Sequence, residues 1–95
     1  MPAARRPRSS ALPPGSRGRN VIGNRLFLAR HHHTPPLTAE ALSTLVFDRT
    51  GTDISGNMIS KIENGLRVAY DYEVRAFADA LAVSTDWLLG RTDER

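Results

Sequence analysis

A short segment near the middle of the chain carries side chains that could read the edges of nucleic-acid bases. Asn suits adenine and Lys suits guanine, because their donors and acceptors match the patterns that these bases present in the major groove of DNA. The spacing predicts that Asn57 and Lys61 share the outward face of a helix over residues 55–64, with Ser55 as its N-cap. That outward face is small and polar: Gly56, Asn57, Ser60 and Lys61. Such a slim face fits a groove, although an ordinary solvated helix face is the alternative interpretation.

A second amphipathic segment and a glycine-containing turn precede this helix. Thr38 is a good N-cap for a helix that ends around Asp48, and residues 49–53 then predict a turn. The inward residues of the two helices are apolar: Ala41, Leu42, Leu45 and Val46 in the first, and Met58, Ile59 and Ile62 in the second. Asn64 and Gly65 both tolerate the left-handed conformation that closes a helix. Two helices joined in this way are typical of a helix-turn-helix unit.

Three further helices are predicted around this pair. The first begins at Ile22 and stops before the Pro35-Pro36 break, the next runs from an Asp71 cap to about residue 81, and the last runs from a Ser84 cap to residue 90. Their apolar positions are Ile22, Leu26, Leu28 and Ala29 in the first helix, and Val74, Phe77, Ala78 and Leu81 in the next. No alternating run is long enough to predict a strand. We therefore expect an all-α, five-helix domain over residues 21–90, followed by a frayed C-terminus over residues 91–95.

The positive charge of the chain is concentrated at its N-terminus. The chain has 95 residues and a net charge of +3. Residues 1–20 carry five arginines and no acid, whereas residues 21–95 carry eight basic and ten acidic side chains. Because residues 1–20 are rich in Arg, Pro, Ser, Gly and Ala, we expect this tail to remain disordered when free. Any binding of a polyanion by the body must then come from a local arrangement of residues.

Composition and motifs argue against several other classes of protein. The absence of cysteine excludes disulfides, thiolate zinc sites and cysteine nucleophiles. No apolar run reaches the length of a membrane span or of a signal-peptide core, so we expect a cytoplasmic protein. The triplet at residues 31–33 is all histidine, but its members point in different directions and lack a further ligand at metal spacing. Scattered acids and the lack of a glycine-rich phosphate loop argue against an enzyme, and we expect neither a metal nor a cofactor.

Several stretches, taken in order, resemble the lambda-repressor and Cro-like helix-turn-helix regulators of the XRE family. Residues 59–65, Ile-Ser-Lys-Ile-Glu-Asn-Gly, resemble the end of that family's recognition helix. Residues 22–26, Ile-Gly-Asn-Arg-Leu, with the Ala-Arg pair at 29–30, resemble its first helix, and residues 78–84 and 86–90 resemble its fourth and fifth helices. The resemblance implies a lambda-repressor-like fold that binds double-stranded DNA as a transcriptional regulator, most simply a repressor, in the cytoplasm of a bacterium or phage and associated with the nucleoid.

The resemblance also implies roles for individual side chains. Ser55 caps the recognition helix, Asn57, Ser60 and Lys61 read bases, and Asn64 and Arg67 contact phosphates. The implied set of DNA contacts is Thr38, Ser55, Gly56, Asn57, Ser60, Lys61, Asn64 and Arg67. The family counterparts of Arg30 and Glu63 form an ion pair that positions the recognition helix.

Three departures from the family pattern suggest that part of the affinity comes from elsewhere. The turn from residue 48 to 54 is longer than the usual three or four residues, Ala39 replaces a phosphate-gripping glutamine, and Gly56 lacks a side chain where the family often reads a base. Arg17 and Arg19 of the tail lie nearest the body and could follow phosphates or a narrow minor groove. The alternative is that the tail is a solubilising extension or an overlong start.

The sequence leaves partners and the mode of regulation open. Trp87, Leu88 and Leu89 are more often core residues, but a terminal helix this bulky could form part of a two-fold dimer contact, which would pair two half-sites about one DNA turn apart. One alternative function is an antitoxin that binds a toxin or another protein partner and represses its own operator. A purely architectural DNA binder is a third possibility, and would show steep salt dependence without base preference.

Overall fold

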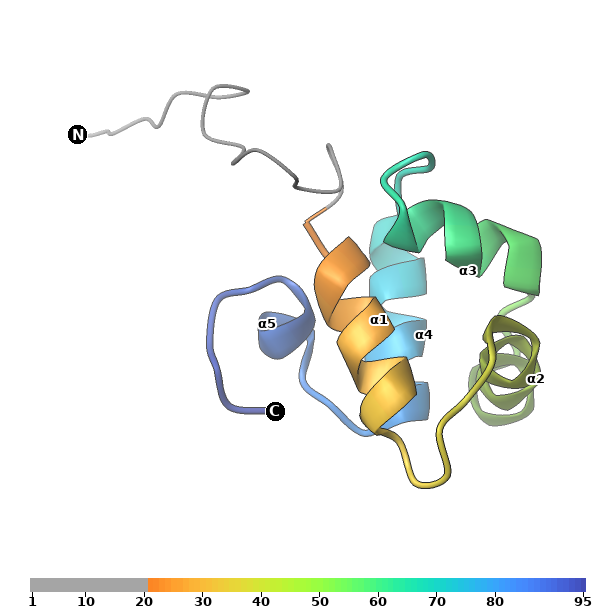
Figure 1. Ribbon diagram of the computed structural model, residues 1–95, viewed down its shortest axis with the longest axis horizontal. Helices are drawn as coiled ribbons and strands as arrows, with labels where there is room; N and C mark the ends of the chain where they lie inside the picture. Colours follow the sequence, from red (N-terminus) through yellow and green to blue (C-terminus); the bar gives the residue numbers. More distant parts are fainter. Residues whose placement is uncertain (1–20) are drawn as a thin grey trace.

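The computed structural model describes residues 21–95, and all of its regular elements within that range are α-helices, which confirms the all-α prediction (Figure 1). The five helices of the described residues are α1 (Gly23–His32), α2 (Ala39–Thr50), α3 (Gly56–Glu63), α4 (Asp71–Leu81) and α5 (Thr85–Leu88). Helix α4 packs against α2, α1 and α5, while α3 packs against α2 and α1. The predicted arginine-rich tail over residues 1–20 lies outside the described residues.

Helix α1 buries one side and lies close to the end of α3. Ile22, Leu26 and Ala29 are buried, as the helical spacing predicted, but Leu28 is 39% exposed rather than inward-facing. A Cβ atom added to Gly23 would lie 3.0 Å from the carbonyl oxygens of both Ile62 and Glu63. The absence of a side chain at residue 23 therefore allows the N-terminal end of α1 to approach the backbone of α3 closely.

Helix α2 begins where predicted but ends two residues later. The Thr38 hydroxyl accepts a hydrogen bond of 3.0 Å from the Ala41 N–H, which is the expected N-cap. At the other end, Gly51 adopts a left-handed conformation with φ of 76°, and its N–H donates to the Phe47 carbonyl at 2.9 Å. The connector to α3 is therefore limited to residues 51–55, shorter than the sequence indicated. Ala41, predicted to face inward, is exposed.

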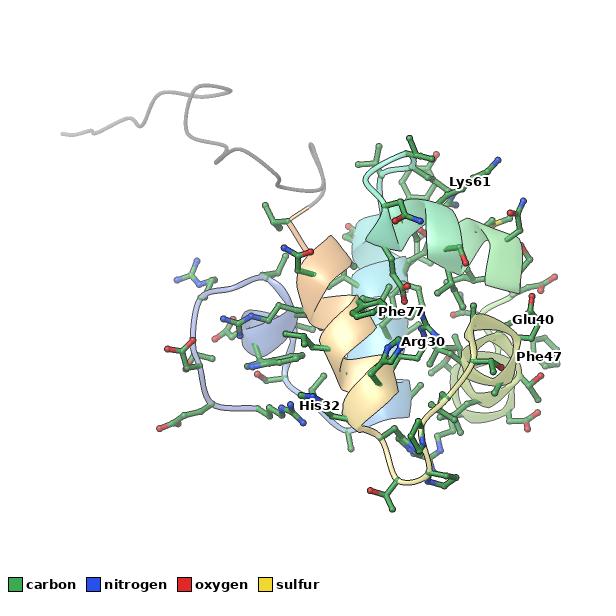
Figure 2. All side chains as sticks on the ribbon, viewed as in Figure 1. Arg30, His32, Glu40, Phe47, Lys61 and Phe77 are labelled. Carbon is green, nitrogen blue, oxygen red and sulfur yellow. The ribbon has the colours of Figure 1, made fainter. Side chains whose placement is uncertain are left out.

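The core draws on all five helices and on the connector before α3. Its largest fully buried side chains are Ile22, Leu26, Leu42, Val46, Ile54, Ile59, Ile62, Phe77 and Leu88. Phe77 is completely buried and lies on α4, as Figure 2 shows. Asp71 is the first residue of α4 and not its cap, because Tyr70 holds the extended N-cap position. Ser84 does cap α5, since its hydroxyl accepts from the Trp87 N–H at 3.0 Å.

The C-terminal segment lies beside α1. Arg25 donates to the carbonyls of Trp87 at 3.1 Å and Thr92 at 3.0 Å, and also pairs with the Asp93 carboxylate at 3.0 Å. The guanidinium groups of Arg25 and Arg95 lie 4.9 and 5.0 Å from the centre of the Trp87 ring. Contacts of the C-terminal segment with α1 and α5 therefore run through Arg25 and the Trp87 ring.

Replacing Phe77 with Ala should remove the largest buried side chain of α4 and leave a cavity. We expect the free energy of unfolding to fall by about 3–5 kcal/mol, measured by urea denaturation followed by far-ultraviolet circular dichroism. Phe47 is 56% exposed on α2 and provides a matched control. Phe47→Ala should change stability by less than about 0.5 kcal/mol, and equal losses in the two variants would contradict this placement of the core.

Candidate nucleic-acid interface

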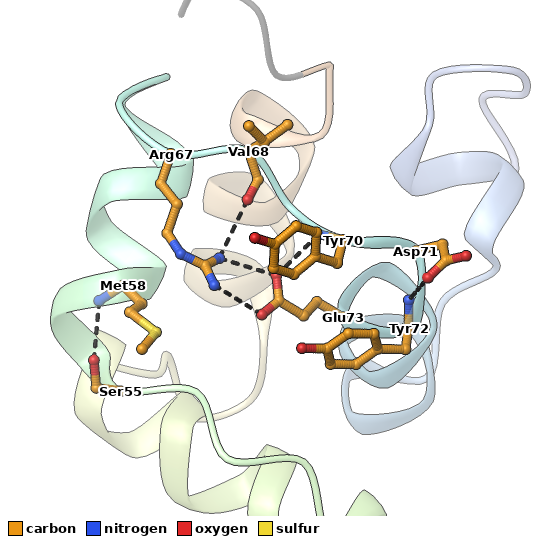
Figure 3. A network of polar contacts seen from close by, with 8 residues as sticks. All are labelled: Ser55, Met58, Arg67, Val68, Tyr70, Asp71, Tyr72 and Glu73. Carbon is orange, nitrogen blue, oxygen red and sulfur yellow. Dashed lines mark hydrogen bonds and ion pairs between the residues drawn. The ribbon is translucent and has the colours of Figure 1, made fainter.

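Helix α3 presents a polar face outward and is anchored by an apolar face. The Ser55 hydroxyl accepts a hydrogen bond of 3.1 Å from the Met58 N–H, which confirms Ser55 as the N-cap (Figure 3). Ile59 and Ile62 are fully buried, and Met58 is partly buried against the core. Helix α3 ends at Glu63, and only Gly65 of the two predicted closing residues adopts positive φ, at 75°. The helix is therefore short, capped and fixed along its inner side.

Two of the predicted base readers are exposed on this helix. Asn57 and Lys61 are exposed one helical turn apart, and Ser60 between them is half-buried. Figure 2 shows Lys61 extending away from the body of the protein. The side chains that could meet a base edge are therefore one carboxamide and one ammonium group, with a hydroxyl beside them.

Gly56 departs from its predicted outward position. It is buried, and a Cβ atom added to it would lie 2.6 Å from Oε2 and 2.8 Å from Cδ of Glu40. The carboxylate of Glu40, which comes from the first turn of α2, thus occupies the space beside the start of α3. Sequence reasoning missed Glu40, and the only signal was the unusual glycine at the first position of α3. The interface therefore includes a negative charge next to its proposed reading side chains.

The end of α3 is tied to α1 by the ion pair that the resemblance implies. Arg30 donates from Nε to one Glu63 oxygen at 2.8 Å and from Nη2 to the other at 2.7 Å, and it also donates to the Leu37 carbonyl at 3.0 Å. The side chains are only 12% and 6% exposed. The hydrogen bonds from Arg30 to Glu63 are the main reason that the pKa of Arg30 is raised. Arg30 thus positions α3 and does not face a ligand.

Arg67, for which the resemblance implied a phosphate contact, is 25% exposed and forms an ion pair with a buried acid of the same chain. Its two terminal nitrogens donate to the two oxygens of Glu73 at 2.9 Å each, and Nη1 also donates to the Val68 carbonyl at 3.2 Å (Figure 3). Glu73 is buried and accepts a further hydrogen bond of 3.0 Å from the Tyr70 N–H. Arg67 therefore joins the connector after α3 to the first turn of α4.

The balance of forces on Glu73 favours its charged form. Burial acts to raise the pKa of this carboxyl, but hydrogen bonds from Arg67 and the Tyr70 N–H, with the attraction of the guanidinium charge, outweigh it and hold the pKa below its usual value. The bidentate hydrogen bond to Glu73 likewise raises the pKa of Arg67. The pair is therefore ionised at neutral pH.

The remaining predicted site residues differ in their exposure to solvent. Thr38 and Asn64 are exposed, and Asn64 Nδ2 donates to the Ser60 carbonyl at 2.9 Å. Arg17 and Arg19 lie outside the described residues. Trp87 and Leu88 are 5% and 0% exposed within the domain itself, so Leu89, at 40%, is the one residue of this group with surface to offer a partner chain.

Two kinds of feature were searched for among residues 21–95: a cluster of metal ligands and a helix that could span a membrane. No three His, Cys, Asp or Glu side chains of this range converge as a metal site would require. His33 and His31 instead face the carbonyls of Pro35 and Phe27 through Nδ1, at 2.9 and 3.1 Å. None of the helices in the described range has the length and apolar character needed to cross a bilayer.

The Arg67–Glu73 pair should make stability depend on pH in the acidic range. The pKa of the Glu73 carboxyl is lower in the folded state than its ordinary value of 4.5. As the pH falls below about 4.5, the unfolded state therefore binds more protons than the folded state. The free energy of unfolding decreases as a result. Glu73→Gln should cost about 3 kcal/mol at pH 7, with a smaller difference from wild type at pH 3, measured by urea denaturation at both pH values.

The control for this experiment is Asp71→Asn, which removes a neighbouring carboxylate that is exposed and outside the ion pair. If Glu73→Gln and wild type differ equally at both pH values, the charge of Glu73 is not what stabilises the pair.

Comparison of the chain with protein-family models, with curated proteins and with solved structures found no match. Function must therefore be inferred from the surface that α2 and α3 present and from the charges around it.

Proposed function

We propose that the protein binds double-stranded DNA in a sequence-specific manner, reading the major groove with α3, and acts as a transcriptional regulator, most simply as a repressor that blocks access to its site. The observation that carries this proposal is the outward placement of Asn57 and Lys61 on a helix whose opposite face is buried. The proposal includes a lambda-repressor-like arrangement in which α2 and α3 form the helix-turn-helix pair.

The shape and chemistry of α3 favour groove reading over simple solvation. Its exposed side has no bulky apolar group, and the small side chain of Ser60 keeps it narrow beside Asn57 and Lys61. A major groove about 12 Å wide accepts a helix of this kind. Asn57 can donate to and accept from adenine, whereas Lys61 can donate to the two acceptors of guanine.

Pre-organisation also supports the proposal. Arg30 and Glu63 fix the end of α3 to α1, while Ser55 fixes its beginning. A reading helix held in this way loses little conformational freedom on binding, so more of the hydrogen-bond energy contributes to affinity.

The charges of the described residues leave phosphate attraction weak. Arg25, Arg30 and Arg67 are paired with acids of the same chain, and Glu40 adds a negative charge beside α3. Lys61 is exposed on α3 and contributes one positive charge to this surface. The arginine-rich segment over residues 1–20 is therefore the expected source of nonspecific affinity, through contacts with phosphates.

Truncation of the reading side chains should reduce discrimination between sequences. With a duplex selected from a random pool and a random duplex of equal length, we expect Asn57→Ala and Lys61→Ala each to weaken selected binding by about 1–3 kcal/mol more than random binding. Fluorescence anisotropy at fixed salt measures both affinities.

Arg75→Ala is the matched control, because it removes one exposed positive charge from α4 instead of α3. It should leave the ratio of the two affinities unchanged. Equal weakening of both duplexes by the α3 variants would show that α3 contributes charge alone and would overturn base reading.

Removal of the charge at Glu40 should strengthen binding to any duplex. Because this carboxylate lies beside the start of α3, it repels nearby phosphates, and Glu40→Gln should raise the affinity for selected and random duplexes by about two- to tenfold at low salt. Asp86→Asn changes the charge equally on α5 and serves as control. A loss confined to the selected duplex would contradict this role and show that Glu40 accepts a hydrogen bond from a base.

A further inference from the structure

A hollow of about 200 Å³ lies between the C-terminal end of α2 and α4. The described residues that line it come from α2, the connector after it and α4: Arg49, Thr50, Thr52, Tyr72, Arg75, Ala76 and Asp79. None of them belongs to α3, so the hollow is separate from the proposed reading face. Its volume is below the roughly 300–1,000 Å³ typical of sites for drug-sized ligands, so its ligand must be small. We refer to this space as the α2–α4 hollow.

The guanidinium of Arg49 is held beside the hollow by a contact with α4. Its Nη1 donates a hydrogen bond of 3.1 Å to the Ala80 carbonyl, and among the described residues it has no other partner. Two of its three nitrogens can therefore donate to a ligand. The adjoining turn is fixed by Thr50, because its hydroxyl donates to the Val46 carbonyl at 2.7 Å and accepts from the Thr52 N–H at 3.1 Å. The donors on this side of the hollow are thus positioned by the fold.

Two opposite charges lie one helical turn apart on the α4 side of the hollow without pairing. Arg75 and Asp79 are both exposed, and the ion pairs formed among the described residues include neither of them. At a spacing of four residues, an arginine and an aspartate on a helix are close enough to interact. Both charges are therefore available to a ligand in the hollow that they line.

The charges in and around the hollow determine the class of ligand that it can take. Arg49 and Arg75 repel a cation. A multiply charged anion such as phosphate is repelled by Asp79, and also by three acids that are sequence neighbours of the lining residues: Asp48, Asp53 and Asp71. A small molecule with one carboxylate and one ammonium group is neutral overall. It brings a negative charge to the arginines and a positive charge to the aspartate, so its charges match those of the hollow.

We propose that the α2–α4 hollow binds a free α-amino acid. The carboxylate of the amino acid accepts hydrogen bonds from Arg49 and Arg75, and its ammonium group donates to Asp79. Its side chain lies along the Tyr72 ring, which is 55% exposed. This inference goes beyond the proposed function. Because binding is measured without DNA, its failure and a failure of DNA binding are separate results.

The first test is a titration of the full chain with each of the common L-amino acids, followed by two-dimensional ¹H–¹⁵N NMR. We expect at least one to bind with a Kd on the order of 1 mM, because a ligand of few atoms gains limited binding energy. The amide shifts should be concentrated at residues 49–52 and 72–79. The matched ligands are the N-acetyl derivative, which lacks the ammonium group, and the amide, which lacks the carboxylate. Each should bind about tenfold more weakly or worse.

The second test removes each charge of the hollow in turn. Arg75→Gln should weaken binding of the amino acid by about tenfold or more. Arg91→Gln is its matched control, because it removes an exposed arginine outside the hollow and should bind like wild type. Asp79→Asn should weaken binding of the amino acid by a similar factor without weakening that of the N-acetyl derivative, whereas Asp86→Asn should change neither.

Circular dichroism of each variant establishes that it is folded before its affinity is compared. Shifts outside the two segments only, or no shifts with any amino acid, would overturn the proposal. Equal binding of the amino acid and its N-acetyl derivative, or an Arg75→Gln variant that binds like wild type, would do the same. Inorganic phosphate is a further probe. If it shifts the same amides at lower concentration than any amino acid, the hollow binds anions and the proposal is wrong.

Discussion

The placement of α3 depends on the buried ion pair between Arg30 and Glu63. Neither charge would be stable in the interior alone, because an unpaired buried ion carries a large desolvation cost. Together they form two short hydrogen bonds, and the third donor of Arg30 binds the Leu37 carbonyl, so α1, the connector to α2 and the end of α3 are held at one point. With Gly23 allowing close contact on the same side, the opposite face of α3 is left free.

This use of arginine limits what the surface can offer to DNA. Arg25, Arg30 and Arg67 hold parts of the fold together, and the body carries more acidic than basic side chains. Long-range attraction of phosphates by the described residues is consequently weak. What α3 contributes to the proposed binding is shape and directed hydrogen bonds, which determine the choice of sequence more than the total affinity.

The features predicted well from sequence are those set by near neighbours. The caps at Thr38, Ser55 and Ser84 each join a hydroxyl to an N–H three residues later, so the local sequence contains both partners. The all-α composition and most apolar faces follow from helical spacing in the same way. The later end of α2 was missed because several turn-forming residues precede Gly51, and only the structure shows which of them ends the helix.

Where the predicted position of a site residue was wrong, the cause is a tertiary contact with another helix that the local sequence does not contain. Gly56 was assigned to the outer face by its helical position, but Glu40 of the preceding helix covers it. For Trp87 and Leu88 the sequence favoured the core over a dimer contact, and burial confirms the core for both, with arginines from α1 and the C-terminal segment close to the Trp87 ring. Helical periodicity predicts which side of a helix a residue lies on, but not which residue of another helix packs against it. Such contacts can be identified only once the tertiary structure is known.

Arg67 shows how a near neighbour can engage a side chain that the resemblance assigns to a ligand, because its guanidinium donates to both oxygens of Glu73. The Arg67 guanidinium also lies 5.5 Å from the centre of the Tyr70 ring, while Leu66 and Val68 on either side of Arg67 are 76% and 61% exposed. The connector after α3 is therefore tied to the start of α4 through Arg67, while its apolar side chains remain at the surface.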